Sequence, residues 1–335
     1  MIRIGIICPS EIAYRRFMPA LDKLEGFSFV GVAIANLTEW EGSDAALIAA
    51  EKDKATSFIS DYGGKIFDSY SSLIYSEEVD AIYMPLPPAL HFHWAEKALK
   101  AGKHVLVEKP ATISLEDTSS LVQLATEKKL ALHENYMFVF HQQLTDLESI
   151  VQSGKIGAVR LYRLSFGFPR RNANDFRYNK ALGGGALLDA GGYTIKYASM
   201  LLGKSTKLAT AHSQFVDDFE VDISGSATLV NDEKVVAQIA FGMDNSYKCD
   251  LEVWGSKGTV KSGRVFTAPE GFIPEATVQV GTEITTSLLS EDDAFMKSIA
   301  HFKNCIVNAK IRKDNYTQII QQATLVDEFI VQTHL

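Results

Sequence analysis

The residues best suited to chemistry in the first half of the chain are Glu108-Lys109-Pro110, an acid, a base and a proline in a row. They follow His104 to Val107, an apolar, β-branched run that predicts a buried strand. Proline disfavours helix at the residue before it, so Lys109 is expected at the strand end rather than on a helix surface. Because ligands of open α/β sheets bind beyond the carboxyl ends of strands, this pair is a candidate site. A surface turn with two solvated charges is the alternative interpretation.

A second group of residues suited to chemistry begins with three consecutive glycines, Gly183-Gly184-Gly185. Three glycines in a row allow the backbone to approach another surface closely. The residues that follow, 187–202, are predicted to form a helix. Asp189 and Tyr193 are four residues apart and share a face of that helix, which Lys196 continues. A carboxylate beside a phenol suits acid–base catalysis. The alternative is a helix with a glycine-rich entry and an exposed polar stripe.

The first predicted strand, Ile2 to Cys8, runs into a turn where a dinucleotide-binding domain usually carries GxGxxG or GxGxxA. Cys8 and Ser10 stand at the first two glycine positions, and Ala13 stands at the third, where a small residue suffices. Cys8 would be strained at a positive φ, whereas the hydroxyl of Ser10 could donate a hydrogen bond to a phosphate. Glu11 is expected to point away. Taken alone, this turn is more typical of a plain strand–turn–helix connection than of a dinucleotide site.

The end of the second predicted strand bears on the choice of dinucleotide. In NAD-binding domains an acid at this place receives the 2′-hydroxyl of the adenine ribose. The sequence there is Ala35-Asn36-Leu37-Thr38, and its acids, Glu39 and Glu41, come later. Asn36 and Thr38 could donate hydrogen bonds to a 2′-phosphate, so NADP(H) is favoured over NAD(H).

The order of predicted elements changes along the chain. Over 1–134, strands alternate with helices, which predicts a parallel, doubly wound sheet. From about residue 155 to Val260, strand-like runs follow one another with a single helix between them, which predicts an open, mostly antiparallel sheet. Two helices from about residue 292 end the chain, and the last could pack on either domain. We therefore expect an α/β domain over 1–134 and an α+β domain for substrate binding and oligomerisation over 135–335.

Composition excludes several classes of protein. The 335 residues are 46% apolar and 22% charged, which is typical of a globular protein with a full core. A net charge of −8 makes binding to nucleic acid or to an anionic membrane unexpected. The three cysteines show no CxxC spacing, so neither a disulfide framework nor a metal site is expected. No apolar run reaches the ~18 residues of a membrane span, and no signal-peptide pattern is present, so a cytoplasmic location is expected.

Together these features resemble the Gfo/Idh/MocA oxidoreductase family over essentially the whole chain. The resemblance rests on the run 101–110, on the three glycines followed by Asp189 and Tyr193, and on the proline turn ending in His91. It implies an N-terminal Rossmann domain, a C-terminal domain built on an open sheet, and NAD(P)-dependent chemistry on CH–OH groups. Tyr193 replaces a histidine of many members, as in the branch of glucose–fructose oxidoreductase, dimeric dihydrodiol dehydrogenase and the nucleotide-sugar C-3 ketoreductases. Three segments are most similar to the ketoreductases: 83–87, 134–138 and 175–177.

The resemblance implies hydride transfer between C4 of a nicotinamide and a sugar carbon, and for this branch the reduction of a 3-keto group on a dTDP-linked deoxysugar. Either Lys109 or Tyr193 could supply the proton, and we favour Tyr193, with Lys109 as its electrostatic partner. Asp189 could orient Lys109 or bind a sugar hydroxyl. Two alternatives stay open: a dehydrogenase of a free sugar, polyol or trans-dihydrodiol, and a non-catalytic regulatory protein that binds NAD(P) or sugar.

The remaining expectations concern binding. The cofactor is expected to contact Cys8, Ser10, Glu11, Ile12, Asn36, Thr38, Leu86, Pro87, His91, Glu108 and Lys109. The substrate is expected to contact Asn135, Arg170, Phe176, Arg177, Asp189 and Tyr193, with arginines on the diphosphate. A solvated loop pair is the alternative for Arg170 and Arg171. A homodimer or homotetramer through the C-terminal sheet is expected, because an apolar sheet face must be covered.

Overall fold

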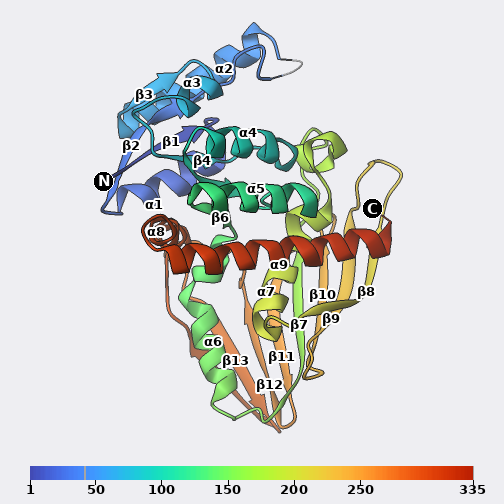
Figure 1. The fold of residues 1–335 in the computed structure, drawn as a ribbon. Coiled ribbons are helices and arrows are strands. Elements are labelled where there is room, and N and C mark those ends of the chain that lie inside the picture. Colours follow the sequence, from blue (N-terminus) through green and yellow to red (C-terminus); the bar gives the residue numbers. More distant parts are fainter. Residues whose placement is uncertain (41–42, 335) are drawn as a thin grey trace. The chain divides into compact units, whose positions relative to one another are not determined.

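The computed structural model describes residues 1–40 and 43–334, which form two compact units (Figure 1). The first unit comprises Met1–Asn135 and Ser298–Ile320, and the second comprises Tyr136–Lys297 and the chain from Gln321 onward. Helix α9, Ala309–Thr333, therefore contributes its first part to one unit and its remainder to the other.

The first unit is built on a parallel sheet that has six strands in the described chain, in the order β3-β2-β1-β4-β5-β6. The interior strands are rich in Ile and Val and are buried along most of their length, because helices cover both faces of such a sheet. The order reverses between β1 and β4, which makes the carboxyl ends of these strands the place for a ligand. The predicted doubly wound sheet is confirmed. Its strands are β1 Ile2–Ile7, β2 Phe27–Ala33, β3 Lys65–Phe67, β4 Ala81–Met84, β5 His104–Glu108 and β6 Leu132–Asn135.

The helices of the first unit begin where the sequence places capping residues. Asp44 accepts a hydrogen bond from the Leu47 N–H at 2.8 Å, and Ser114 accepts one from the Asp117 N–H at 3.1 Å. The helical segments are η1 Ala13–Phe17 (a π-helical turn), α1 Met18–Asp22, α2 Ala45–Tyr62, α3 Tyr70–Ile74, α4 Pro88–Lys100, α5 Leu115–Lys128, most of α8 Ala294–Val307, and the start of α9.

The second unit is built on a sheet with eight described strands, in the order β14-β13-β12-β11-β7-β10-β9-β8. All neighbours are antiparallel except β7 and β10, which confirms the predicted open, mostly antiparallel sheet. The last two strands are not anticipated by the sequence pattern. The strands are β7 Val159–Gly167, β8 Lys207–Gln214, β9 Ser224–Val230, β10 Val236–Gly242, β11 Lys248–Gly255, β12 Gly258–Gly263, β13 Glu275–Val280 and β14 Glu283–Leu288.

One face of this sheet is covered by a helix that begins as a π-helical turn, η5 Leu187–Gly191, and continues as α7 Gly192–Leu202. The second part of α9 shares the same core, with the rings of Phe241 and Phe329 5.5 Å apart. Lys196 is buried as a consequence, so the alternative of an exposed polar stripe is wrong. The unit also contains α6 Gln142–Gln152 and three short 3-10 turns, η2 Met137–Phe140, η3 Phe176–Tyr178 and η4 Lys180–Leu182.

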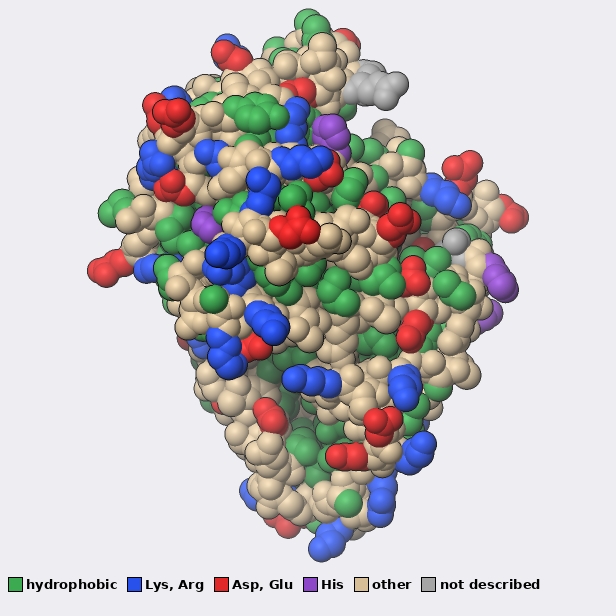
Figure 2. All heavy atoms as spheres, viewed as in Figure 1, with side chains coloured by type: hydrophobic (Ala, Val, Ile, Leu, Met, Phe, Trp, Pro, Cys, Tyr) green, Lys and Arg blue, Asp and Glu red, His purple; other side chains and the backbone are tan. Residues whose placement is uncertain are grey.

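The surface agrees with the acidic composition. On the face drawn in Figure 2, basic side chains are interspersed with acidic ones. None of the helices in the described ranges combines the length and the apolarity that crossing a membrane requires.

Candidate active site

Glu108 ends β5, and the chain then turns through a cis peptide bond between Lys109 and Pro110. The carboxylate of Glu108 accepts hydrogen bonds at 2.7 Å from the Tyr83 hydroxyl and at 2.7 Å from the Asn135 amide. Burial raises the pKa of Glu108, whereas these two hydrogen bonds and the charge of Lys109 lower it. Three neighbouring strands thus hold the acid at the carboxyl edge of the sheet, where the sequence predicts a site.

Asn135 is predicted to bind substrate, but its side chain is buried and both ends of its amide are engaged within the first unit. Its oxygen accepts a hydrogen bond from the Ser298 hydroxyl at 2.7 Å. The same hydroxyl lies 3.0 Å from the His133 Nε2. His133 Nδ1 lies 2.9 Å from the amide oxygen of Asn315, whose nitrogen donates to a backbone carbonyl. A buried chain of hydrogen bonds therefore extends from Glu108 through Asn135 and Ser298 to His133, and it holds the Glu108 carboxylate in place.

Sequence reasoning missed three residues of this hydrogen-bond chain, namely His133, Ser298 and Asn315. One signal was available: the polar run His133-Glu134-Asn135 interrupts a predicted buried strand, and buried polar groups need partners. The partners on α8 and α9 are far away in the sequence, so no spacing rule could have identified them.

His91, predicted to face the cofactor, is fully buried in α4. Its Nδ1 lies 2.8 Å from the Pro110 carbonyl oxygen and its Nε2 lies 2.8 Å from the Leu86 carbonyl oxygen. Burial lowers the pKa of His91 to about 4 and outweighs the two carbonyl groups, which favour the charged ring. The ring lies between the proline turn before α4 and the turn after Lys109, and in its neutral form it donates a hydrogen bond to one of the two carbonyl groups. Leu86 and Pro87 belong to that first turn, and Pro87 precedes the first residue of α4.

The turn after β1 adopts the left-handed conformation at Cys8, with φ of 73°, where the motif has its first glycine. Burial and the nearby Glu51 raise the pKa of the Cys8 thiol to about 12, so this thiol is neutral. The Ser10 hydroxyl accepts a hydrogen bond from the Ala13 N–H at 3.2 Å, which differs from the expected donation to a phosphate. Glu11 is exposed and pairs with Arg15, in agreement with the expectation that it points away, and Ile12 is also exposed.

The end of β2 presents Asn36 and Thr38, as predicted, but they bond to each other: the Thr38 hydroxyl donates to the Asn36 side chain at 2.7 Å. The Glu39 carboxylate turns toward the start of α3 and accepts from the N–H groups of Tyr70 and Ser71 at 2.8 and 2.9 Å. A helix N-terminus stabilises a carboxylate, so the charge of Glu39 is already engaged. Glu41 lies outside the described residues.

These observations fit a dinucleotide at the carboxyl edge of the first sheet. The backbone at Cys8 already has the conformation that the glycine motif supplies. The Glu39 carboxylate lies 3.4 Å from the Asn36 N–H beyond the end of β2, and two N–H groups at the start of α3 also bind it.

In the second unit, the Tyr193 ring is surrounded by aromatic rings. Its centroid lies 5.2 Å from that of Phe166, 5.3 Å from that of Tyr136 and 5.5 Å from that of Phe138. Phe266 lies at 6.1 Å. Edge-to-face and tilted rings at these distances attract each other and restrict rotation of the phenol. The orientation of Tyr193 is therefore set by packing.

Asp189 is paired with Arg177, whose Nε lies 2.7 Å from the aspartate Oδ2. Arg177 also pairs with Asp175 at 3.1 Å, and its guanidinium lies 4.7 Å from the centre of the Phe176 ring. The structure thus brings together Phe176, Arg177 and Asp189, three residues predicted to contact substrate. Sequence reasoning did not anticipate the ion pair.

Arg170 is a different case. Its guanidinium is half-exposed and lies between Asp218 and Asp244, with both ion pairs at 3.0 Å. Arg171 places its guanidinium 5.2 Å from the centre of the Phe168 ring. These contacts agree better with the alternative of a surface loop pair than with a diphosphate site.

Known proteins match both units. Residues 3–136 match the model described as the oxidoreductase family with an NAD-binding Rossmann fold, and residues 144–261 match the Gfo/Idh/MocA C-terminal domain. A dTDP-3,4-didehydro-2,6-dideoxy-α-D-glucose 3-reductase from Actinomadura kijaniata is 35% identical over 326 residues, covering 97% of this chain and 94% of the relative. The chain belongs to the Gfo/Idh/MocA oxidoreductase family. The resemblance inferred from the sequence is confirmed.

Further family relatives agree. A reductase with the same name from Streptomyces violaceoruber is 35% identical over all of this chain and 96% of the relative. A 3-ketoreductase from Actinomadura kijaniata, solved in complex with NADP and TDP-benzene, superposes with a TM-score of 0.91 at 33% identity over 99% of this chain and 98% of that one. An aldose–aldose oxidoreductase from Caulobacter crescentus, at 20% identity and a TM-score of 0.85 over 99% of this chain and 97% of that one, shares the fold.

Proposed function

We propose that this protein reduces the 3-keto group of a dTDP-linked deoxysugar, with NADPH as the hydride source. The observation that carries the proposal is the likeness over nearly the whole chain to dTDP-sugar 3-reductases at 35% identity. The 3-ketoreductase from Actinomadura kijaniata that was solved with NADP supports NADP(H) over NAD(H).

Lys109 and Tyr193 are the proposed catalytic residues. The solved ketoreductase was also studied with a lysine replaced and with a tyrosine replaced. Those two residues are separated in their chain by the same number of positions as Lys109 and Tyr193 here. The spacing supports equivalent positions in the two chains.

The mechanism follows from the chemistry of ketone reduction. A bound NADPH would supply hydride to the keto carbon, which leaves an alkoxide that needs positive charge and a proton. Lys109, at the end of β5, would supply the charge, and Tyr193 would supply the proton. A charged lysine beside a tyrosine stabilises the phenolate that forms when the tyrosine gives up its proton. Glu108, held by Tyr83 and Asn135, would accept hydrogen bonds from the nicotinamide ribose.

The substrate diphosphate requires cations, and Arg177 is the proposed one. Its guanidinium is mostly buried between Asp175 and Asp189, which keeps it extended and oriented. A planar guanidinium can hold a carboxylate and a phosphate oxygen at once. Asp189, fixed by this pair, would accept a hydrogen bond from a sugar hydroxyl.

Turnover of a dTDP-3-keto-deoxysugar with NADPH, measured by loss of nicotinamide absorbance, tests the proposal. Lys109→Met and Tyr193→Phe should each lower kcat by ~100-fold or more if they share proton transfer. Lys128→Met and Tyr75→Phe, which change exposed side chains, serve as matched controls. Turnover of xylose or a trans-dihydrodiol with no activity on the nucleotide sugar would favour the dehydrogenase alternative. Cofactor binding without turnover of any of these substrates would favour a regulatory protein.

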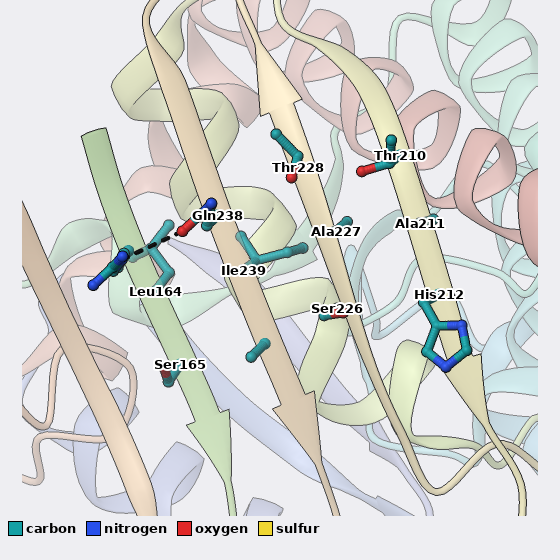
Figure 3. A pocket seen from close by; sticks show the side chains of 12 residues that line it. Leu164, Ser165, Thr210, Ala211, His212, Ser226, Ala227, Thr228, Gln238 and Ile239 are labelled. Carbon is teal, nitrogen blue, oxygen red and sulfur yellow. Dashed lines mark hydrogen bonds between the residues drawn. The ribbon is translucent and has the colours of Figure 1, made fainter. Parts of the chain in front are cut away.

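We also propose that the open face of the second sheet binds a second copy of the chain. Figure 3 shows side chains on this face, such as Ser165, Gln238, Thr228 and His212, which come from four neighbouring strands. They surround a shallow depression of about 440 Å³. The face is polar, which differs from the expectation of an apolar face that must be covered, because the apolar residues of these strands point into the core.

Small side chains on this face, including Ser226 and Ala240, would allow two sheets to approach closely. Light scattering in solution tests this, and a dimer or tetramer mass is expected. Ser226→Arg, which fills the depression with a charged chain, should shift the mass toward the monomer, whereas Asp232→Arg in the turn before β10 should not. A monomeric wild type would contradict the proposal.

We propose a cytoplasmic location. In the described chain, Cys8, Cys249 and Cys305 are all free thiols, and the last two are buried. Free thiols are usual in a reducing compartment. Cell fractionation with an antibody against the native protein would test the location.

A further inference from the structure

The helix that carries Asp189 and Tyr193 receives its N-terminal cap from a distant residue. The residue before the helix is Ala186, whose methyl group cannot accept a hydrogen bond. Asp222, in the connection between β8 and β9, takes this role: its Oδ2 accepts from the Leu187 N–H at 2.8 Å. The backbone carbonyl of Asp222 accepts from the Ala186 N–H at 2.9 Å. One residue thus binds two consecutive N–H groups at the helix start.

Burial of the Asp222 carboxylate, which this role requires, costs free energy. Its side chain is 4% exposed, and burial raises its pKa to about 6, while the N–H groups of Leu187, Asp222 and Ala186 lower it. A carboxylate at a helix N-terminus is also stabilised by the helix dipole. Near neutral pH the group is therefore ionised and forms charge-assisted hydrogen bonds, which are roughly twice as strong as neutral ones.

The glycine run is explained by the same contact. Gly185 has φ of +119°, and a Cβ there would lie 2.3 Å from Asp222 Oδ1. A Cβ on Gly184 would lie 2.4 Å from the Arg177 carbonyl oxygen. The glycines thus let two segments approach the helix start: the connection that holds Asp222 and the turn that holds Arg177, the ion-pair partner of Asp189.

We propose that Asp222 is a positioning residue for the reaction, which holds the start of the helix so that Asp189 and Tyr193 are correctly placed. The proposal rests on the proposed function of those two residues. Asp189 lies within the π-helical turn that Asp222 caps, and Tyr193 lies one turn further on. Loss of the cap would let this turn shift, and a misplacement near ~1 Å can cost ~100-fold in rate.

Asp222→Ala removes the acceptor, and Gly185→Ala forces a Cβ onto it. Each variant should lower kcat by ~10- to 100-fold per folded molecule, while the Kd for NADPH, measured by nicotinamide fluorescence, stays unchanged. Asp222→Asn keeps the shape and an acceptor oxygen, so its loss should be smaller than that of Asp222→Ala. Asp232→Ala, which changes an exposed aspartate in a turn of the same unit, is the matched control.

Hydrogen exchange of the amides over 186–193 provides a readout that does not depend on activity. In Asp222→Ala these amides should exchange faster than in the wild type, while those of α6 should not change. Unchanged exchange over 186–193 would overturn the proposal, as would unchanged kcat, or a loss of kcat matched by an equal loss of NADPH binding. A wild type inactive on all keto-sugars would instead refute the proposed function, and exchange would still decide whether Asp222 holds the helix.

Discussion

The candidate residues fall into two groups, a first half in the first unit and a second half in the second unit, and the two groups are held by different forces. In the first unit, Glu108 is fixed by hydrogen bonds that continue through Asn135 and Ser298 to His133. In the second unit, Tyr193 is fixed mainly by the rings around it, and Asp189 by the ion pair with Arg177. The first half should therefore be most sensitive to the loss of a polar partner, and the second to a change of volume or charge.

The difference follows from the sheets. In a parallel sheet covered on both faces, polar groups such as Asn135 and Ser298 are buried and must find partners inside the protein. The second unit places its helix on one face of an open sheet, where large aromatic side chains fill the space above the strands. Substitutions in each unit, and the dependence of stability on pH, test this difference.

Asn135→Leu removes the centre of the polar chain. It would leave the Glu108 carboxylate and the Ser298 hydroxyl each without one partner, and buried groups in this state cost ~1–3 kcal/mol each, more for a charge. We expect the free energy of unfolding to fall by ~3–5 kcal/mol in urea denaturation. Asn172→Leu, at an exposed loop position, should change it by less than ~0.5 kcal/mol. Equal effects of the two substitutions would mean that the polar chain contributes nothing specific.

Arg177→Met removes the cation between Asp175 and Asp189. Both carboxylates are mostly buried, so we expect a loss of ~2–3 kcal/mol in the free energy of unfolding. Arg170→Met is a matched control, because Arg170 also has two aspartate partners but is 40% exposed. It should cost clearly less than Arg177→Met, because water screens an exposed ion pair. A larger loss at Arg170 than at Arg177 would contradict the assigned roles.

Gly192→Ala tests the packing of the second half. A Cβ there would lie 2.1 Å from the Tyr136 hydroxyl oxygen, which the Gln322 amide holds at 3.3 Å. Overpacking of this kind costs ~1–3 kcal/mol, measured as a lower Tm. Gly263→Ala, where a Cβ meets nothing within 4 Å, should be neutral. Adding Tyr136→Phe to Gly192→Ala removes the clashing oxygen and should recover part of the loss; no recovery would rule out this clash as the cause.

The two halves should also respond to pH in opposite directions. His91 has its pKa lowered from 6.5 to about 4, so the unfolded chain binds its proton first and stability is lost as pH falls from 6.5 toward 4. Asp222 has its pKa raised from 3.8 to about 6, so the folded chain binds the proton first and stability is lost as pH rises from 4 toward 6. Each slope is at most ~1.4 kcal/mol per pH unit.

Unfolding of His91→Gln and Asp222→Asn at pH 4.5, 5.5 and 6.5 measures these slopes. The stability of the wild type relative to His91→Gln should decrease as pH falls, and its stability relative to Asp222→Asn should increase. The same sign for both variants would contradict the opposite burial effects.

Much of the fold could be predicted from local pattern. Alternating strands and helices over 1–134 predicted the parallel sheet, and Asp44 and Ser114 are found at helix starts as capping rules suggest. The strands β13 and β14 were missed. The residues of β14 are exposed throughout, so this strand lacks the alternation of buried and exposed positions that marks a strand in sequence.

The site could be predicted only in part. Lys109, Asp189 and Tyr193 were identified by their types and by the turns before them. The partners of Asp189 and Glu108 were not, because Arg177 was interpreted as a phosphate ligand and Asn135 as a substrate ligand. In both cases, the sequence interpretation considered only the ligand, whereas the structure shows that the residue also binds another protein group.

The family, the two kinds of sheet and the places of Glu108-Lys109-Pro110 and Gly183-Gly184-Gly185 could be predicted from the sequence, since these depend on local periodicity and turn chemistry. The contacts that hold these two segments in place could not, because they form only in the packed chain. Glu108 is connected through Asn135 to Ser298, His133 and Asn315. Asp222 lies against Gly185, although the two residues are far apart in the sequence. Buried polar groups must be satisfied, but any of many residues could satisfy them, and only the packed chain selects which ones do.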